Sequence, residues 1–311
     1  MRTLAPLVIF VYKRAEITKK MLYAINQNFL AKETEVFIFS DGPKGNTDVE
    51  QVKQVRKLIK EFECNNNFKR VSIIEEEKNK GLANSIIGGV TKIINKYGKV
   101  IVLEDDLVVA TNFLQFMNDC LEYYQDMDNV WSIGGTTYNL QGLSQYKHDV
   151  YACYRGESCG WASWKNRWDM IDWNVSDYSQ FRHSIRRRLK FKRGGQDMVA
   201  ALERQMSGQT DSWAIRWCYC QSKNDMITIL PRKSFVKNIG WGEDSTHAKE
   251  NYDIFYTSVE SEGFHYHLEP VSIDKVLMRE FRKYFSRPLF KRVLDKVYEK
   301  WKECKFEKYN K

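Results

Sequence analysis

The segment Val100-Ile101-Val102-Leu103-Glu104-Asp105-Asp106 constrains the fold most, because four apolar residues run directly into three acidic ones. A run of branched apolar residues is typical of a strand buried on both faces. Three carboxylates at the end of such a strand are costly unless a positive group lies beside them. A divalent cation that carries a phosphorylated ligand meets this need. The segment therefore predicts a metal-assisted nucleotide or phosphate site at the carboxyl edge of an α/β sheet. The alternative is a solvated turn, with Asp106 near the start of a helix at Asn112.

Alternating strand and helix patterns surround this segment. In the first half, the sequence predicts strands over 7–12, 35–40, 71–74 and 99–103, and helices over 16–30, 47–62 and 82–97. Further along, it predicts helices over 112–125, 176–189, 196–207 and 211–221, and strands over 130–133 and 226–230. The Trp-rich segment 160–169 is predicted to begin a helix. The repeated β-α order indicates a mainly parallel sheet with helices on both faces.

Basic residues are concentrated near the C-terminus. Residues 279–311 contain 12 Lys/Arg and 5 Asp/Glu, a net charge of +7, while the whole chain of 311 residues carries +9. Apolar residues recur there with helical spacing, so we expect a basic amphipathic helix in a tail over 273–311. Such a helix suits an anionic membrane surface, and the alternative is a helix packed on the domain. No nucleic-acid module is recognisable, so nucleic acid is not an expected partner.

Neither the N-terminus nor the cysteines indicate export. The apolar run after Met1 is too short to span a bilayer and lacks a small-residue cleavage site. The 7 cysteines form no Cys-x-x-Cys pair, so reduced structural thiols are expected. We therefore expect a cytoplasmic protein that can bind peripherally to the inner face of the cell membrane.

Three common active-site signatures are absent from the sequence. Lys13-Arg14-Ala15-Glu16 follows the first predicted strand, where a dinucleotide-binding fold would have Gly-x-Gly-x-x-Gly. There is no Walker A sequence, and there is no Gly-x-Ser-x-Gly elbow. These absences argue against dinucleotide-binding proteins, P-loop enzymes and α/β-hydrolases.

Four short segments instead resemble those of GT-A glycosyltransferases, which use nucleotide-sugar donors. The segments are Ser40-Asp41-Gly42, Asn79-Lys80-Gly81-Leu82-Ala83, Leu103-Glu104-Asp105-Asp106 and Asn112-Phe113-Leu114-Gln115-Phe116. Over residues 4–247 the chain is similar to bacterial family 2-like sugar transferases and to the N-acetylglucosaminyltransferase I family. The resemblance implies a Rossmann-like α/β fold with a mixed, mainly parallel sheet. It also implies a nucleotide-sugar-binding half over 1–138 and an acceptor-binding and catalytic half over 139–272.

The same resemblance implies roles for residues near the ends of the predicted strands. Asp106 matches the metal ligand, Asp105 would contact the ribose or bound sugar, and Glu104 would contact donor-sugar hydroxyls. The alternative for Glu104 is a structural hydrogen bond to a neighbouring loop.

By the same resemblance, five residues that precede Glu104 are also expected to bind the donor. Tyr12, Lys13 and Arg14 lie where the family binds the base and phosphates, and Asp41 would accept a hydrogen bond from the base or ribose. Lys80 precedes a helix N-terminus, which suits an anion. The alternative for each is an ordinary surface charge.

Three residues of the second half complete the predicted site. By resemblance, Asp211 beside Trp213 would be the catalytic base for the acceptor hydroxyl, although Asp is also a favoured helix N-cap. His247 would lie against the diphosphate and the metal, unless it belongs to an ordinary polar loop. Trp161 would stack on the sugar, while most tryptophans serve core packing.

These observations predict a metal-dependent, inverting glycosyltransferase. The expected cation is Mn²⁺ or Mg²⁺, because both suit oxygen ligands. The expected partners are a nucleotide-diphosphate sugar and a saccharide or lipid-linked saccharide acceptor in surface-polysaccharide synthesis. A retaining mechanism, a sugar-nucleotide pyrophosphorylase and a non-catalytic carbohydrate-binding scaffold remain as alternatives.

Overall fold

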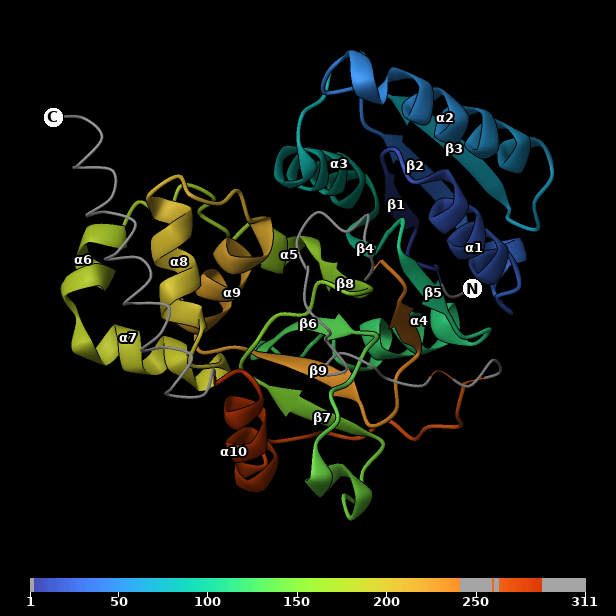
Figure 1. Ribbon diagram of the computed structural model, residues 1–311. Coiled ribbons are helices and arrows are strands. Elements are labelled where there is room, and N and C mark those ends of the chain that lie inside the picture. The colour runs from blue at the N-terminus through green and yellow to red at the C-terminus, as the bar shows by residue number, and fades with distance from the viewer. Residues whose placement is uncertain (1–2, 241–258, 260–262, 287–311) are drawn as a thin grey trace, which may run out of the picture.

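A computed structural model describes residues 3–240, 259 and 263–286 (Figure 1). In this part of the chain, one sheet contains eight strands in the order β3-β2-β1-β4-β8-β6-β9-β7. The strands are β1 (Leu7–Val11), β2 (Glu35–Ser40), β3 (Arg70–Glu75), β4 (Lys99–Glu104), β6 (Val130–Gly134), β7 (Val150–Cys153), β8 (Trp161–Trp164) and β9 (Ile227–Pro231). Strands β8 and β7 run antiparallel to their neighbours, and the other six share one direction. The predicted mixed, mainly parallel α/β fold is therefore confirmed.

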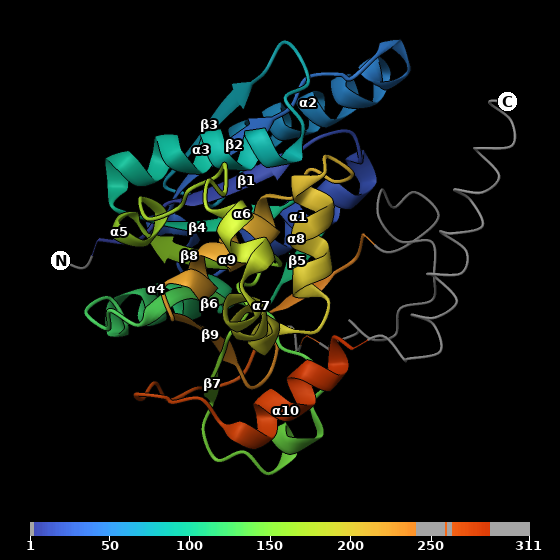
Figure 2. The same cartoon turned by 90° about the vertical axis from the view of Figure 1, so that its left-hand side faces the viewer.

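Helices cover both faces of this sheet, as Figures 1 and 2 show. The longer helices are α1 (Ala15–Asn26), α2 (Val49–Cys64), α3 (Leu82–Tyr97), α4 (Phe113–Tyr123), α8 (Met198–Met206) and α9 (Trp213–Lys223). In β1, Leu7 and Ile9 pack in one core with α1, α2 and α4. The alternate residues Val8 and Phe10 pack in a second core with α3, α8 and α9. Buried residues on both faces explain why β1 is apolar at every position.

The remaining elements are short. They are α5 (Lys165–Trp168), α6 (Tyr178–His183), α7 (Ile185–Phe191), α10 (Lys275–Tyr284), β5 (Leu107–Val109), β10 (Val236–Asn238), and the 3₁₀ turns η1 (Ala31–Glu33), η2 (Asn46–Asp48), η3 (Gln141–Ser144) and η4 (Lys192–Gly194). Strands β5 and β10 form a separate antiparallel pair. In the main sheet, β8 lies between β4 and β6. One sheet thus crosses the boundary expected near residue 138, and that division remains a prediction.

The Trp-rich segment was predicted to begin a helix, and this prediction is wrong over its first part. Trp161–Trp164 forms β8, and the helix α5 begins only at Lys165. The side chains alternate across the sheet, with Trp161 in the core on the α3 side and Trp164 in the core on the α4 side. Burial on both faces makes the strand apolar at most positions, so the sequence lacks the polar alternation that marks a half-buried strand.

Two predicted helices differ from those observed. The helix predicted over 16–30 ends at Asn26, so Phe29 lies beyond it and is 62% exposed. The helix predicted over 176–189 is divided into α6 and α7 at Ser184. The Ser184 hydroxyl accepts a hydrogen bond from the backbone N–H of Arg187 at 3.3 Å and so caps α7.

Helix α10 is the described part of the predicted basic tail. Its apolar side chains Leu277, Met278 and Phe281 are buried against Tyr138 and Tyr151, beside β7. The amphipathic pattern predicted around residues 290–301 lies outside the described residues. Within the described ranges, no helix is both long and apolar enough to cross a membrane. The six cysteines described there form no disulfide.

Candidate functional site at the carboxyl edge of the sheet

Three neighbouring parallel strands end at one edge of the sheet and bring the predicted donor-site residues together. Strand β1 pairs with β2 on one side and with β4 on the other. Tyr12 and Arg14 follow β1, Asp41 follows β2, and Glu104 ends β4. This edge lies at the reversal of strand order, where open α/β sheets bind ligands.

Arg14 links the end of β1 to the acidic turn after β4. Its guanidinium pairs with the Asp105 carboxylate, and its Nη2 also lies 2.9 Å from Asp106 Oδ2. Burial disfavours the charge on Arg14, but the carboxylates of Asp105 and Asp106 raise its pKa above the usual value. The acidic turn therefore has the positive neighbour that its charge density requires.

The carboxyls of this turn are electrostatically unequal. Burial, followed by the charges of Asp106 and Asp105, raises the pKa of Glu104 to about 8. Burial also raises the pKa of Asp105, although Arg14 opposes this shift. The Glu104 side chain makes no hydrogen bond or ion pair with any residue that the structure describes, whereas Asp105 and Asp106 both contact Arg14. Glu104 is thus the carboxyl most available to a ligand.

Asp41 holds the loop that precedes α3. Its Oδ1 accepts hydrogen bonds from the backbone N–H groups of Gly42 and Lys80, each at 2.9 Å, and its Oδ2 accepts one from Gly81 at 3.1 Å. A Cβ on Gly42 would lie 2.5 Å from the backbone of Lys78, so only glycine fits this approach. The contacts of Asp41 therefore order the loop, whatever else the carboxylate binds.

The side chain of Lys80 points to a local partner. Its Nζ lies 2.6 Å from Glu76 Oε1, and the side chain is 51% exposed. The backbone N–H of Lys80, by contrast, donates to Asp41. The ammonium therefore has a carboxylate partner in this structure.

Tyr12 and Lys13 share a partner that the sequence analysis missed. The Tyr12 hydroxyl donates to Asp48 Oδ2 at 2.6 Å, and Lys13 Nζ donates to Oδ1 at 2.9 Å. Burial and the Asp48 hydrogen bond raise the pKa of Tyr12 to about 12. Asp48 lies in η2 without a motif of its own, so its role depends on the folded position of that turn.

A pocket of about 310 Å³ lies next to the acidic turn. Its lining includes Tyr138, Arg155, Glu157, Cys159, Ser212 and Phe285. It also includes Asn238 of β10, whose partner in β5 is Leu107, the residue after Asp106. The backbone N–H of Ile239 donates to the Asp106 carbonyl at 2.8 Å. These contacts connect the pocket directly to the acidic turn.

Glu157 is a buried carboxylate in the pocket wall and was also missed from the sequence. It is 5% exposed. Its Oε2 accepts from the Tyr138 hydroxyl at 2.5 Å, and its Oε1 accepts from the backbone N–H groups of Ser158 and Cys159 at 2.9 Å. The only signal in the sequence is an acid between Gly156 and Gly160. The folded structure is needed to show that this loop lines a pocket.

Arg155 and Phe285 form another part of the wall. The Arg155 guanidinium makes two 3.0 Å contacts with the two oxygens of Asp197. Its central carbon lies 3.9 Å from the ring centroid of Phe285. Phe285 follows α10, so the C-terminal segment contributes directly to the pocket.

Asp211 lies beside this pocket rather than in its wall. Its neighbour Ser212 lines the pocket and caps α9, because the Ser212 hydroxyl accepts from the Ile215 N–H at 3.3 Å. The N-cap alternative for Asp211 is therefore wrong. The Asp211 side chain is 61% exposed and lies 3.2 Å from Arg216 Nη2. It is accessible to an acceptor hydroxyl.

Trp161 lies away from any surface that could hold a sugar. Its side chain is 0% exposed, and its ring packs against those of Trp168, Trp213 and Trp217 at centroid distances of 5.8, 5.4 and 5.2 Å. The core-packing alternative describes this residue, and the expected sugar contact does not fit its position. The reason is the strand β8, which directs Trp161 into the core.

The predicted metal site is only partly described. His247 lies outside the described residues. Among the described side chains, no group of three His, Cys, Asp or Glu forms a ready metal site. The oxygens of Glu104 and Asp106 are the chemically suitable donors at this edge.

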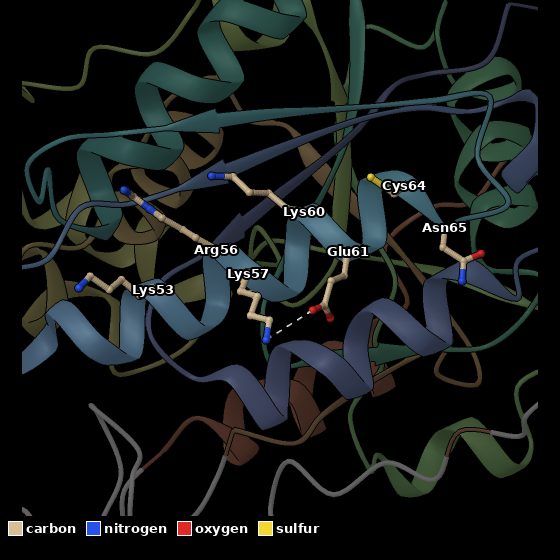
Figure 3. Close-up of a pocket in the computed structure, with 7 residues that line it drawn as sticks. All are labelled: Lys53, Arg56, Lys57, Lys60, Glu61, Cys64 and Asn65. Carbon is tan, nitrogen blue, oxygen red and sulfur yellow. Dashed lines mark ion pairs between the residues drawn. The ribbon is translucent and has the colours of Figure 1, made fainter.

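A second hollow lies on α2, away from the strand ends. It is lined by Lys53, Arg56, Lys57, Lys60, Glu61, Cys64 and Asn65 (Figure 3). Figure 3 shows the Lys57 and Glu61 side chains directed toward each other, with Nζ and Oε1 4.0 Å apart. Residues of α2 and its C-cap, most of them charged, form this surface, and none of the predicted site residues lines it.

The profile of the family described as glycosyl transferase family 2 matches residues 7–191, more than half of the chain. The chain belongs to this family. The matched region of this family 2 member includes β1, β2, β4 and the acidic turn, together with Glu157 in the pocket wall. Asp211 follows the matched region.

Known relatives are similar over limited lengths. Over 80 residues the chain is 31% identical to an alpha-1,3-mannosyl-glycoprotein 2-beta-N-acetylglucosaminyltransferase from Arabidopsis thaliana, a match that covers 25% of this chain and 18% of that protein. The crystal structure of S. aureus TarS matches with a TM-score of 0.33 and 11% identity, over 42% of this chain and 22% of that one. GalNAc-T7, crystallised with UDP, GalNAc and Mn²⁺, matches with a TM-score of 0.46 and 12% identity, over 81% of this chain and 46% of that one. The chain spans less than half the length of each.

Proposed function

We propose that this family 2 member is a metal-dependent, inverting glycosyltransferase. It would transfer a hexose or N-acetylhexosamine from a nucleotide-diphosphate sugar to a saccharide acceptor. One observation carries the proposal: Asn238, in the wall of the pocket that contains Glu157, pairs with Leu107, which directly follows the acidic turn. A diphosphate at this turn would place its sugar toward the pocket. The name of the Arabidopsis relative makes N-acetylglucosamine the first sugar to test.

The nucleotide would lie across the ends of β1 and β2. Tyr12 and the Asp41 carboxylate are proposed to contact the base or ribose, and Asp105 the ribose or sugar. The Arg14 guanidinium would turn from the carboxylates toward the diphosphate, because phosphate oxygens suit its planar set of donors. Lys80 would contribute if the phosphates draw its ammonium from Glu76.

Oxygen chemistry supports a cation beside Asp106. The Glu104 carboxyl has no hydrogen-bond or ion-pair partner among the described residues. The backbone at Gly240 passes close to the Asp106 carboxylate, because a Cβ placed on Gly240 would lie 2.3 Å from Asp106 Oδ2. We propose Asp106 as a protein ligand and His247 as a further one, with diphosphate oxygens and water completing the shell. When bound, Mn²⁺ or Mg²⁺ would supply positive charge that stabilises the leaving diphosphate.

The pocket and its rim would hold the reacting sugars. A carboxylate offers about four acceptor positions, and Glu157 uses three in the contacts with Tyr138, Ser158 and Cys159. The remaining position and the unpartnered Glu104 would accept from sugar hydroxyls. Asp211 would take the proton from the acceptor hydroxyl as that oxygen attacks the anomeric carbon opposite the diphosphate.

The acceptor class is proposed from charge. The net charge of +7 over residues 279–311 suits an acceptor presented on an anionic membrane, such as a lipid-linked saccharide in surface-polysaccharide synthesis. We therefore propose that the enzyme works at the inner face of the cell membrane.

Product analysis tests the function. The full chain would be incubated with Mn²⁺, a panel of nucleotide sugars and lipid-linked or soluble saccharides. A glycosyltransferase releases a nucleoside diphosphate and lengthens the acceptor, whereas a pyrophosphorylase releases pyrophosphate. Release of neither product with any donor would favour the non-catalytic scaffold. The anomeric configuration of the product decides between inversion and retention.

A further inference from the structure

The segment around α7 is strongly basic and contains no acidic residue. Between Asp177 and Asp197 there are seven Lys/Arg and no Asp or Glu. The seven are Arg182, Arg186, Arg187, Arg188, Lys190, Lys192 and Arg193. The segment lies over α8 and α9 in the second half of the fold, away from β1 and β2 (Figures 1 and 2).

Some of these side chains have acidic partners on neighbouring elements. Arg187 pairs with Asp177 at 3.3 Å, and Arg188 pairs with Glu203 at 2.7 Å. Lys190 and Arg193 both pair with Asp225, at 3.0 and 2.5 Å. These contacts attach the segment to the body of the protein.

The other basic side chains have no ion pair within the described ranges. They are Arg182 and Arg186, which are exposed, and Lys192, which is half-buried. Two large aliphatic side chains lie among them: Ile185 is 76% exposed and Leu189 is 61% exposed. Positions four residues apart share a helix face, so Ile185 and Leu189 project together from α7. Two exposed aliphatic side chains on one helix face, in a segment that also carries unpaired cations, suit an interface.

Helix α10 extends this basic surface. It contacts η4, which directly follows α7, and both views show α10 close to α7 (Figures 1 and 2). Its inner face is buried, whereas Lys275, Arg279, Arg282 and Lys283 are exposed. None of these four forms an ion pair with an acid in the part of the chain that the structure describes.

We propose that this α7–α10 surface docks the protein on an anionic lipid bilayer. Ile185 and Leu189 would enter the boundary between headgroups and acyl chains, and the unpaired Arg and Lys side chains would contact lipid phosphates. Charge complementarity and the paired aliphatics favour this occupant over a nucleic acid, which would gain little from exposed Ile and Leu. The docking rests on described residues and does not require the proposed transferase activity.

Vesicle binding tests the surface. The full chain would be sedimented with vesicles of phosphatidylcholine alone or of equal parts phosphatidylcholine and phosphatidylglycerol. Wild type should bind the anionic vesicles and not the neutral ones. Arg186→Glu/Lys192→Glu should weaken binding at least about tenfold, because two cations at the surface become anions. Ile185→Ser/Leu189→Ser should weaken binding while the net charge stays unchanged.

A matched control distinguishes binding through this surface from binding that depends only on the net charge of the protein. Lys53→Glu/Lys57→Glu makes the same change in net charge on the exposed face of α2 (Figure 3) and should bind as wild type. Equal losses for both charge-reversal pairs would overturn the proposal in favour of diffuse attraction. It would also be overturned if the α7 variants bind vesicles as wild type does, or if only removal of 287–311 abolishes binding. A third contradicting result would be competition by double-stranded DNA for vesicle binding together with wild-type vesicle binding by Ile185→Ser/Leu189→Ser. Melting temperatures of all variants establish folding.

Discussion

Arg14 Nη2 lies 2.9 Å from Asp106 Oδ2, although the two residues are 92 positions apart in the chain. The contact joins the end of β1 to the turn after β4. The pairing of β1 with β4 therefore brings a positive charge next to the acidic residues of the candidate donor site. The same guanidinium pairs with the more deeply buried Asp105.

Removal of this guanidinium should destabilise the protein. In Arg14→Ala, Asp105 and Asp106 would keep their mutual repulsion without a counter-charge. Loss of one partner from a largely buried ion pair costs about 3 kcal/mol. Urea unfolding would measure this change in the free energy of unfolding. Arg187→Ala, at a more exposed ion pair, is the control and should cost less than about 1 kcal/mol. Equal effects of the two substitutions would contradict a structural role for Arg14.

We expect Trp161 to stabilise the fold and not to contact the donor sugar. Trp161→Phe shrinks a ring that packs among three other tryptophans, so the free energy of unfolding should fall by about 1–3 kcal/mol. The dissociation constant of a nucleotide sugar, measured by calorimetry well below the melting temperature, should stay within about twofold of wild type, under 0.5 kcal/mol. A large loss of affinity in a folded variant would restore the sugar-contact role.

Glu157 should affect both the pocket and its ligand. In Glu157→Gln, one oxygen becomes an NH₂ group that cannot accept a hydrogen bond. A hydrogen bond to a charged group contributes about 1.5–3 kcal/mol, so kcat/KM for the preferred sugar should fall at least about tenfold.

Tyr138→Phe is the matched control for this effect. It removes the 2.5 Å hydrogen bond to Glu157 but leaves the carboxylate in place. Thermal unfolding should show a loss of stability in both variants, whereas steady-state kinetics should show the larger loss in Glu157→Gln. A reversed order would argue against sugar contact by Glu157.

Asp211 should act on the rate without supporting the fold. Because its side chain is 61% exposed, Asp211→Asn should leave the melting temperature nearly unchanged. Loss of a general base lowers kcat by roughly 10²–10⁴-fold, with little change in donor KM. Asp169→Asn, another exposed carboxylate with a basic partner, should leave kcat unchanged. Wild-type kcat in Asp211→Asn would exclude the catalytic role.

Local sequence patterns predicted the first half of the fold well. Strand β4 and helix α3 have strong apolar periodicity, and Gly98 ends α3 in the left-handed conformation that glycine favours. The predicted order of strands also places Arg14 and Asp106 at one edge. Their ion pair, however, depends on side-chain directions that only the folded chain determines.

The second half was harder to predict because its contacts are long-range. Trp161 lies in a strand inserted between β4 and β6, and an apolar segment buried on both faces resembles a helix as readily as a strand. Glu157 lines a pocket because other segments of the chain, which carry Tyr138 and Phe285, form the rest of its wall. Neither residue belongs to a motif with Glu157.

The central claim is a donor site built around Asp106, and thermal stabilisation by ligands tests it most directly. Wild type, Asp106→Asn and the exposed control Asp128→Asn would be melted with each nucleoside diphosphate and nucleotide sugar, with and without Mn²⁺. A ligand at about 100 times its dissociation constant adds about 2.7 kcal/mol to stability. We predict a Mn²⁺-dependent shift with one nucleotide in wild type and Asp128→Asn that is lost in Asp106→Asn. The absence of a shift with every ligand, or an equal shift in Asp106→Asn, would contradict the account.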